Sequence, residues 1–223
     1  MIWVAEIGSM HQGNKSLAYE LIRKAKWAGA TIAKFQLGWD KEAQFKYAGD
    51  YDERRFIDPW AEDLAKWCAD MDIEFMASIW STEGLEVARS VGMKRYKIAH
   101  QLRGYDLIDA IYDEAEFIYH SISNEVGFYP VGSWSNRILV YTEDNYPTYE
   151  NHYRNFDFKH KGYSSHMHGI ADALIAVTRG AEYIEKHLTL DKTLSWPRDA
   201  SFALDPTEFR QMVDIGSEIA RIR

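Results

Sequence analysis

The sequence lacks the features that mark several classes of protein. Its 223 residues contain one cysteine, Cys68, so no internal disulfide can form and a reducing, cytoplasmic location is expected. No uninterrupted apolar run approaches the roughly 20 residues of a membrane-spanning helix. The first residues also lack the basic start and long apolar run of a signal peptide. We therefore expect no membrane association.

Positive charge is also scarce. The chain has 26 Lys and Arg against 34 Asp and Glu, which gives a formal net charge of -8. An acidic protein does not attract a polyanion over long range, so nucleic acid is not an expected partner. A small anionic ligand remains compatible with this charge, because it needs only a local basic pocket.

The sequence does contain a regular alternation of strand-like and helix-like segments. Short apolar runs at residues 2–8, 31–37, 73–80 and 95–100 are each followed by a segment with helical spacing of apolar residues, at 14–30, 59–71, 81–92 and 105–115. Four strand–helix units in succession predict a parallel sheet.

The second half of the chain continues this pattern less regularly. Strands are predicted at 116–123, 137–143, 162–166 and 183–190, and helices at 169–181 and 205–222. The stretches 124–136 and 146–162 are loop-like in composition. Eight strands predict an α/β (β/α)8 TIM barrel, shortened because the helices after strands 5 and 6 are reduced to loops, with residues 1–223 as a single domain. A doubly wound open sheet is the alternative.

Ionisable and polar residues gather at the carboxyl ends of the predicted strands, where a barrel of this kind places its site. They are Glu6, Lys34, Gln36, Ser78, Lys97, His100, Glu143, Asp144, Ser164, His166, Glu185, Lys186 and His187. Each residue alone is compatible with an ordinary structural role. Their convergence is not, because buried charge is costly unless it is paired or bound to something.

The types of these residues indicate a chemistry. Two lysines with nearby serine and glutamine donors suit a phosphate or carboxylate. Two histidines with a carboxylate suit a divalent metal that keeps positions open for substrate oxygen or water. The residues alone therefore predict a metal-assisted reaction on a small phosphorylated or carboxylated metabolite.

Several stretches, in collinear order over most of the chain, resemble the sialic acid synthase (N-acetylneuraminate synthase) family. They include "AEIGSMHQGNKSLAYELIRKAKWAGATIAKFQ", "NYPT", "GYSSHMHGIADALIAVTRGAEYIEKHLTLDKT" and "DASFALDPTEFRQMV". The segment "EKHLTLDKT", spaced after "SSH", is the most specific of these matches.

The resemblance implies a barrel enzyme that condenses phosphoenolpyruvate with an N-acylated hexose such as N-acetylmannosamine, releasing phosphate and a nonulosonic 2-keto-3-deoxy acid. It implies a divalent metal, Mn²⁺ or Mg²⁺, on His166 and His187, with Glu6 as a further catalytic residue beside the metal. The positions matching the phosphoenolpyruvate site are Lys34, Ser78, Lys97, Ser164 and Asp144.

The sequence departs from the family pattern at the sugar end. Relatives commonly read Lys-Ile-Ala-Ser-Gly-Glu where this chain reads "KIAHQL", so His100 and Leu102 replace a serine and a glutamate. Asp199 or Arg198 matches the family's sugar-binding aspartate. We expect Gln36, His100 and Asp199 to face the acceptor. The family's C-terminal antifreeze-like domain is expected to be lacking.

Two other functions remain open at this point: a non-catalytic barrel that binds phosphoenolpyruvate or a sugar, and a metal-dependent lyase or isomerase that uses the same histidines. A homodimer is expected, because a barrel with missing outer helices leaves apolar strand surface to be covered by a second subunit.

Overall fold

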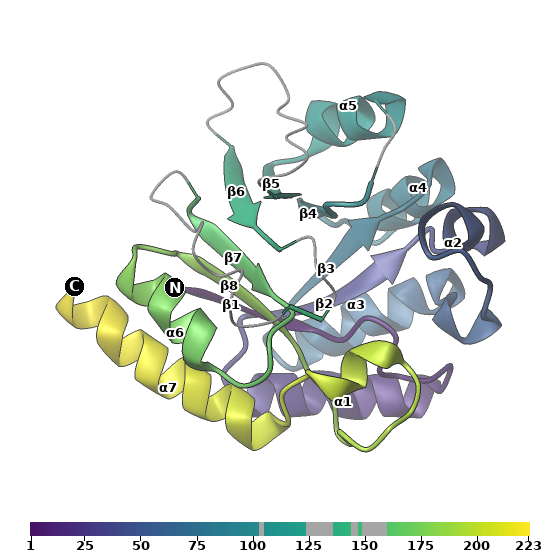
Figure 1. Cartoon of the computed structure of the whole chain (residues 1–223). Coiled ribbons are helices and arrows are strands. Elements are labelled where there is room, and N and C mark those ends of the chain that lie inside the picture. The colour runs from purple at the N-terminus through teal and green to yellow at the C-terminus, as the bar shows by residue number, and fades with distance from the viewer. Residues whose placement is uncertain (103–104, 124–135, 144–146, 149–159) are drawn as a thin grey trace.

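The chain folds as a closed barrel of eight parallel strands in the computed structural model, which describes residues 1–102, 105–123, 136–143, 147–148 and 160–223 (Figure 1). Each strand pairs with its neighbours in sequence, and β1 pairs with β8 to close the sheet. The strands are β1 Ile2–Glu6, β2 Ile32–Leu37, β3 Glu74–Ile79, β4 Arg95–Ile98, β5 Phe117–Ile122, β6 Arg137–Tyr141, β7 Gly162–Ser165 and β8 Tyr183–His187.

Helices lie outside this barrel, as the strand–helix alternation predicts (Figure 1). They are α1 Lys15–Trp27, α2 Lys41–Tyr47, α3 Ala61–Asp70, α4 Thr82–Ser90, α5 Tyr105–Glu114, α6 Ala171–Thr178 and α7 Pro206–Ile222, with short 3₁₀ turns η1 Glu53–Arg55, η2 Asp58–Trp60 and η4 Arg198–Ser201. The TIM barrel is confirmed, and the open-sheet alternative is wrong. The predicted loss of helices after strands 5 and 6 concerns segments that lie largely outside the described residues.

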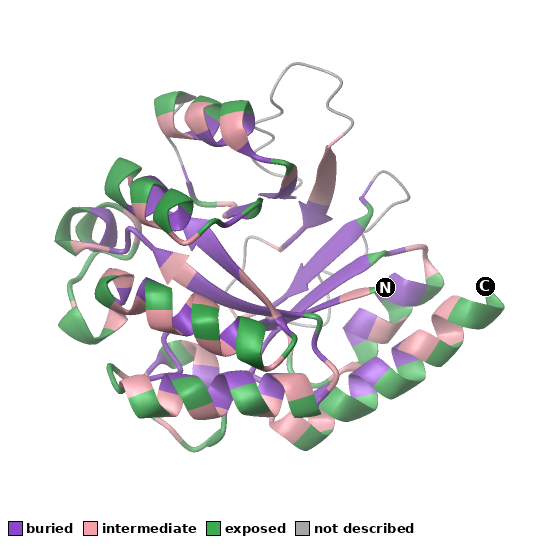
Figure 2. Cartoon of the chain, turned by 180° about the vertical axis from the view of Figure 1, so that it is seen from behind, coloured by how far each residue is buried: buried purple, intermediate pink, exposed green. Residues whose placement is uncertain are grey.

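The helices begin at capping residues and bury one face against the barrel. Asn14 accepts hydrogen bonds from two backbone amides of the first turn of α1, and α7 begins with a capping box between Asp205 and Glu208. Leu21 and Ile22 of α1 are fully buried, each worth roughly 1.5–3 kcal/mol relative to exposure. Figure 2 shows the same division on every helix, with buried residues towards the sheet and exposed residues outward.

The interior of the barrel is divided into an apolar layer and a polar layer. Because side chains alternate along a strand, every second residue points into the barrel. Near the amino ends of the strands the interior holds a buried cluster of Val4, Ile32, Met76, Tyr119, Val140 and Tyr183. One step of two residues further along each strand the interior becomes charged and polar. The apolar layer therefore closes the barrel below the carboxyl ends and forms the base of a site.

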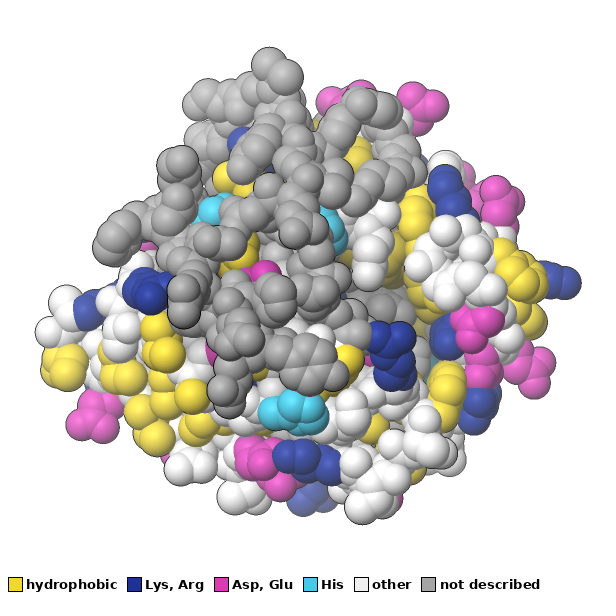
Figure 3. Space-filling view, in the orientation of Figure 1, with side chains coloured by type: hydrophobic (Ala, Val, Ile, Leu, Met, Phe, Trp, Pro, Cys, Tyr) yellow, Lys and Arg dark blue, Asp and Glu magenta, His cyan; other side chains and the backbone are white. Residues whose placement is uncertain are grey.

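Among the described residues, no helix combines the length and apolar character needed to cross a bilayer. Acidic and basic side chains alternate around the described part of the face in Figure 3. Cys68 is fully buried on α3, where it packs in the apolar core and burial raises the pKa of its thiol to about 12.

Candidate active site

Four charged side chains form a buried cluster in the polar layer. Lys34 Nζ lies 2.6 Å from Glu6 Oε2 and 3.6 Å from Glu185 Oε1, and Lys97 Nζ lies 3.6 Å from the same Glu185 oxygen. The strand register brings them together, because Glu6 on β1 pairs with Lys34 on β2, and Ser78 on β3 with Lys97 on β4. All four charged side chains are about 95% buried. Such a cluster is far more ionic than a barrel interior needs for stability.

Hydroxyl groups complete the cluster. Lys34 Nζ donates to Ser78 Oγ at 3.0 Å, and Ser164 Oγ donates to Glu185 Oε1 at 2.8 Å. The Tyr183 hydroxyl, which belongs to the apolar layer, donates to the other oxygen of Glu185. The lysines are therefore paired with carboxylates and hydroxyls, yet they also line an open cavity.

Burial and mutual attraction set the charge states of these groups. Burial raises the pKa of Glu6 to about 7, against the lowering effect of Lys34. Burial would also raise the pKa of Glu185, but Lys34 and Lys97 outweigh it and hold that pKa below its usual range. Burial lowers the pKa of Lys97 to about 8, whereas for Lys34 the two carboxylates outweigh burial and keep its pKa above the usual value. Glu6 is thus the carboxyl that exchanges a proton most readily near neutral pH.

The two predicted histidines lie side by side at the rim of the barrel. The ring centroids of His166 and His187 are 5.6 Å apart, and the Phe202 ring packs edge-on against both. Burial lowers the pKa of each imidazole to about 3, so both are neutral, the form that binds a metal ion.

The donor set around these rings fits a metal only in part. His187 Nδ1 is buried without a hydrogen bond in the described part of the chain, with Asp199 Oδ2 at 3.9 Å. No group of three or more His, Cys, Asp or Glu side chains able to hold a metal occurs among the described residues. Two imidazoles would therefore hold an ion whose other ligands come from substrate or water.

A second buried network fixes the loop that carries His166. Lys186, on the outward face of β8, donates to Ser165 Oγ at 2.8 Å and to the Met167 carbonyl at 2.7 Å. Its Nζ lies 3.6 Å from Asp172 Oδ1, and Asp172 also accepts from Ser165 and Tyr163. The residues immediately before and after His166 are thereby tied to β8 and α6.

The backbone of Gly8 passes close to the side chains of both Glu6 and His187. Gly8 has a φ of +47°, and a Cβ there would lie 3.0 Å from Glu6 Oε1 and 3.8 Å from His187 Cε1. Glycine is required here because other L-residues rarely adopt this conformation and their side chain would crowd Glu6.

One cavity of about 560 Å³ opens over this layer, within the range of small-molecule sites. It is lined by nearly all the residues predicted from sequence: Glu6, Lys34, Gln36, Ser78, Lys97, His100, Ser164, His166, His187 and Asp199, together with Arg198. Asp144, the remaining predicted residue, lies outside the described residues. The two histidine rings and the two lysines thus share one space with room for a ligand.

The structure defines the role of Glu185, one of the polar residues expected at the strand ends, and places others to which the sequence assigned no role. Glu185 holds both lysines, and the signal for it was its position two residues before His187 on the same strand face. Trp39, Tyr47 and Trp80 line the cavity as well. Leu102 is buried in an apolar cluster with Trp80 and is not among the described residues that line the cavity. His100 lines the cavity, with its Nε2 3.4 Å from Ser123 Oγ.

Comparison with known proteins identifies the family to which the chain belongs. The model of the NeuB family matches residues 21–122 and 143–222. The N,N'-diacetyllegionaminic acid synthase of Legionella pneumophila is 26% identical over 94% of this chain and 69% of its own length. The human N-acetylneuraminate-9-phosphate synthase is 25% identical over 94% of this chain and 67% of its own length.

Solved structures show the same fold. The N-acetylneuraminic acid synthetase of Leptospira borgpetersenii superposes with a TM-score of 0.80 at 24% identity, covering 99% of this chain and 84% of that one. The spore coat polysaccharide biosynthesis protein SpsE of Bacillus subtilis gives a TM-score of 0.79 at 22% identity, covering 99% and 68%. The family match over most of the sequence confirms the resemblance noted from the motifs: the chain belongs to the NeuB family.

Proposed function

We propose that the protein condenses phosphoenolpyruvate with an N-acylated hexose such as N-acetylmannosamine, or with a related aldehyde, to give a nonulosonic 2-keto-3-deoxy acid and phosphate. The observation that carries the proposal is the convergence of Lys34, Lys97 and the two histidines on one cavity, in a chain whose relatives are named as synthases of such acids.

The lysine side of the cavity suits phosphoenolpyruvate. Lys34 and Lys97 would supply positive charge to its phosphate and carboxylate, and Ser78 and Ser164 would supply hydroxyl donors at fixed positions. In the reaction, carbon 3 of phosphoenolpyruvate forms a bond to the aldehyde carbon of the acceptor. Water adds to carbon 2. The bond between carbon 2 and the bridging oxygen then breaks, and that oxygen leaves as part of the phosphate. Glu6, buried beside Lys34, is positioned to hold or release a proton during these steps.

His166 and His187 would hold a divalent cation, Mn²⁺ or Mg²⁺, as their neutral rings and spacing allow. Such an ion, when bound, polarises the acceptor aldehyde and lowers the pKa of a bound water. The residues of this chain do the rest of the positioning: Lys186 fixes the loop of His166, and Phe202 packs against both rings.

The acceptor would occupy the part of the cavity beyond the histidines. Gln36, His100 and Asp199 line the cavity and would offer hydrogen-bonding groups to sugar hydroxyls. Leu102, at the position where the resemblance implies a sugar-binding glutamate, is buried and is not among the described residues that line the cavity.

Phosphate release, with Mn²⁺, phosphoenolpyruvate and a panel of N-acylated hexoses and smaller aldehydes, tests the proposal. The expected result is phosphate formation that requires both acceptor and metal, with one 2-keto acid formed per phosphate. Phosphate without a condensation product would contradict it. Ligand binding without turnover would instead indicate a binding barrel, and acceptor consumption without phosphoenolpyruvate would indicate a lyase or isomerase.

We further propose a homodimer as the working form. A closed barrel presents apolar strand surface wherever its outer helices are short, and a second subunit would cover it. Light scattering coupled to size-exclusion chromatography measures the mass directly, and a mass of one chain at micromolar concentration would refute the dimer.

A further inference from the structure

Two loop segments line the mouth of the cavity, one after β2 and one after β8, the two strands that pair with β1. We call residues 38–60 the outer-wall segment and residues 195–199 the β8 rim segment; every residue of the latter lines the cavity. We call five cavity-lining residues on and beside the outer-wall segment the outer wall: Trp39, Tyr47, Asp50, Arg55 and Trp80. The contact between the two segments therefore bears on access to the cavity.

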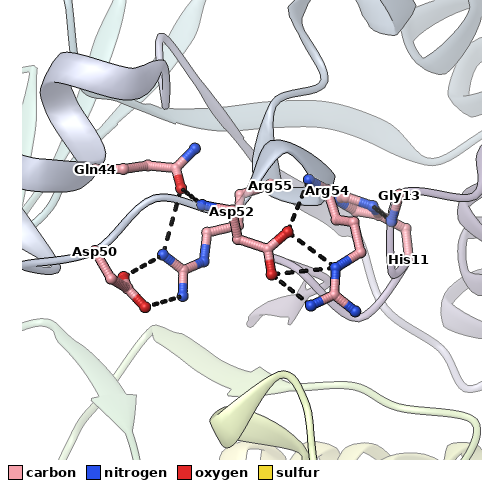
Figure 4. A network of polar contacts seen from close by, with 7 residues as sticks. All are labelled: His11, Gly13, Gln44, Asp50, Asp52, Arg54 and Arg55. Carbon is pink, nitrogen blue, oxygen red and sulfur yellow. Dashed lines mark hydrogen bonds and ion pairs between the residues drawn. The ribbon is translucent and has the colours of Figure 1, made fainter.

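Side-chain hydrogen bonds make the outer-wall segment a rigid unit. Gln44 is fully buried, donates to the Trp39 carbonyl at 2.8 Å and accepts from the Asp52 amide at 2.8 Å. Arg55 and Asp50 form a matched ion pair, in which Arg55 Nη1 donates to Asp50 Oδ1 at 2.7 Å (Figure 4). The same Nη1 donates to Gln44 Oε1 at 3.3 Å, so the ion pair is tied to the buried amide.

Aromatic packing and a carboxylate at the base add to this rigidity. The ring centroids of Trp39 and Trp80 are 4.2 Å apart, and those of Tyr47 and Trp80 are 5.3 Å apart. The Gly38 amide, at the start of the segment, lies 3.0 Å from both carboxylate oxygens of Asp58, near its end. The outer-wall segment is therefore closed at its base and packed along its length.

Arg54 connects the outer-wall segment to the β8 rim segment. Its guanidinium carbon lies 3.8 Å from the centroid of the Trp196 ring, the distance of a cation–π contact. Its Nε donates to Asp52 Oδ1 at 2.9 Å, so a carboxylate of the rigid segment orients the guanidinium (Figure 4). Arg54 itself is not among the described residues that line the cavity. Its contact with Trp196 therefore acts on the mouth from outside the cavity.

The loop after β1 packs against the stem of Arg54. Gly13 has a φ of +71°, and a Cβ there would lie 2.9 Å from Arg54 Cγ, so only glycine leaves room for this stem. The Gly13 amide donates to His11 Nδ1 at 3.1 Å (Figure 4), and the His11 ring packs edge-on against Trp60 of the outer-wall segment. The position of Arg54 is thus fixed by two loops before it reaches Trp196.

The β8 rim segment is held less firmly than the outer-wall segment. Ser195 and Arg198 are exposed, and the side chain of Arg54, which reaches this segment, is itself 47% exposed. A cation–π contact at an exposed site shifts an equilibrium by only about two- to fivefold. The boundary between the two segments is therefore easier to open than the outer-wall segment itself.

We propose that Arg54 is a positioning residue: by stacking on Trp196 it holds the β8 rim segment against the outer-wall segment, and separation of this clasp opens the mouth to ligands. The clasp is the contact between these two side chains. It goes beyond the proposed condensation, because it governs the entry and exit of whichever ligand the cavity binds. Arg54 itself contacts no ligand in this role.

Amide hydrogen exchange of the ligand-free protein tests the clasp. The Ala200 amide, just after the β8 rim segment, donates to the Pro197 carbonyl at 3.0 Å and reports when the segment is released. Arg54→Ala should raise exchange of the peptide that contains this amide about two- to fivefold, the range of the lost contact. Unchanged exchange there would overturn the clasp.

Two further variants separate the clasp from a general effect of removing an arginine. Arg23→Ala is the matched control, because Arg23 on α1 is 53% exposed and pairs with Glu20, and it should leave exchange at Ala200 unchanged. In a Trp196→Leu background, Arg54→Ala should cause no further increase, because the two residues act through one contact. A further increase of the full size would show that Arg54 acts independently of Trp196 and would overturn the proposal.

Stopped-flow fluorescence with phosphoenolpyruvate and Mn²⁺ tests the effect on ligand exchange. Arg54→Ala should raise the association and dissociation rate constants together, about two- to fivefold, and leave Kd within about twofold, because a gate affects both directions equally. An increase of the dissociation rate constant alone, with weaker binding, would indicate a distorted site. That result would overturn the gate.

A covalent lock tests the opposite direction. In an Arg54→Cys/Trp196→Cys variant, a short bismaleimide can join the two new thiols without competition from Cys68, which is fully buried with a pKa of about 12. Joining them should lower both rate constants for phosphoenolpyruvate at least tenfold relative to the same variant before linking. Equal rate constants before and after linking would overturn the gate.

Failure of this inference is distinguishable from failure of the proposed function. Absence of phosphoenolpyruvate binding to the wild-type protein with Mn²⁺ would count against the proposed function, because it tests the lysine end of the cavity. The exchange measurements need no ligand, so they support or overturn the clasp in either case.

Discussion

The floor of the cavity and its outer wall are built in different ways. The floor consists of strand residues such as Lys34, Lys97 and Glu185, whose positions follow from the register of the closed barrel. The outer wall consists of loop and helix residues such as Trp39 and Arg55, held by local packing and side-chain hydrogen bonds. A barrel fixes its floor for every member with the same register, whereas its loops are free to differ. Residues on the strands are therefore suited to a reaction that relatives share, and residues on the loops to a choice of substrate that differs between them.

The largest effect is expected from removing charge from the floor. Lys97→Met should weaken phosphoenolpyruvate binding about 100-fold if the proposed function holds, because the variant loses a buried positive charge that lines the cavity. Stability should be unchanged or higher, since burial lowers the pKa of Lys97 to about 8 and so disfavours its charged form. Calorimetry and thermal unfolding measure both quantities. Lys94→Met, at an exposed lysine, is the control. Equal affinities of the two variants for phosphoenolpyruvate would show that Lys97 does not bind this ligand.

The next largest effect is expected at Lys186, which lies on the outward face of β8 and does not line the cavity. Lys186→Met should weaken Mn²⁺ binding by about 10–100-fold, the range for partners that orient metal ligands, because Lys186 fixes the carbonyl of Met167 beside His166. Calorimetry with Mn²⁺ alone measures this without turnover. Ser165→Ala, which removes a smaller part of the network, should act in the same direction. Lys161→Met, at an exposed lysine, should have no effect.

Comparing alanine substitutions at two glycines distinguishes crowding of Glu6 from the effect of backbone strain alone. Gly8 and Gly49 both have positive φ, +47° and +79°, but a Cβ at Gly49 would meet nothing within 4 Å. Either change to alanine should cost about 1 kcal/mol of unfolding free energy. Only Gly8→Ala should lower turnover, at least tenfold, by displacing Glu6. Denaturant unfolding and the phosphate assay test the pair, and equal turnover in both would show that Gly8 has only a backbone role.

The smallest effect at neutral pH concerns the loop that braces the outer-wall segment. His11 packs edge-on against Trp60, and burial lowers the pKa of His11 to about 4, below its usual 6.5. Because this pKa is lowered in the folded state, the stability it supports is present above pH 6.5 and is lost as the pH falls towards 4. By pH 5 the loss should be about 2 kcal/mol.

Urea unfolding at pH 7.5 and pH 5 checks this pH dependence. In His11→Asn, whose amide oxygen can still accept the Gly13 amide hydrogen bond, the difference between the two pH values should shrink by about the same 2 kcal/mol. A variant with the full wild-type pH dependence would show that His11 does not carry this contribution.

Sequence reasoning reached the floor more completely than the outer wall. The expectation that polar residues gather at the carboxyl ends of the strands included Lys34, Gln36, Glu185 and His187, and all four line the cavity. Sequence reasoning assigned no role to Trp39 and Trp80, because nothing in the sequence brings the two residues together. Forty residues separate them, and only the neighbouring positions of β2 and β3 in the sheet bring their rings to 4.2 Å. Asp144 lies outside the described residues, so its expected place near the phosphate stays a prediction.

The sequence by itself determined the alternation of strands and helices, the barrel, the family and the polar residues at the strand ends, because these follow from local periodicity and short motifs. Only the tertiary structure decided which carboxylate holds which lysine, how Lys186 fixes the histidine loop, and that a matched ion pair and three aromatic rings meet at the mouth. Those contacts depend on distances between segments far apart in the chain, which are set by closure of the sheet and by packing of its loops.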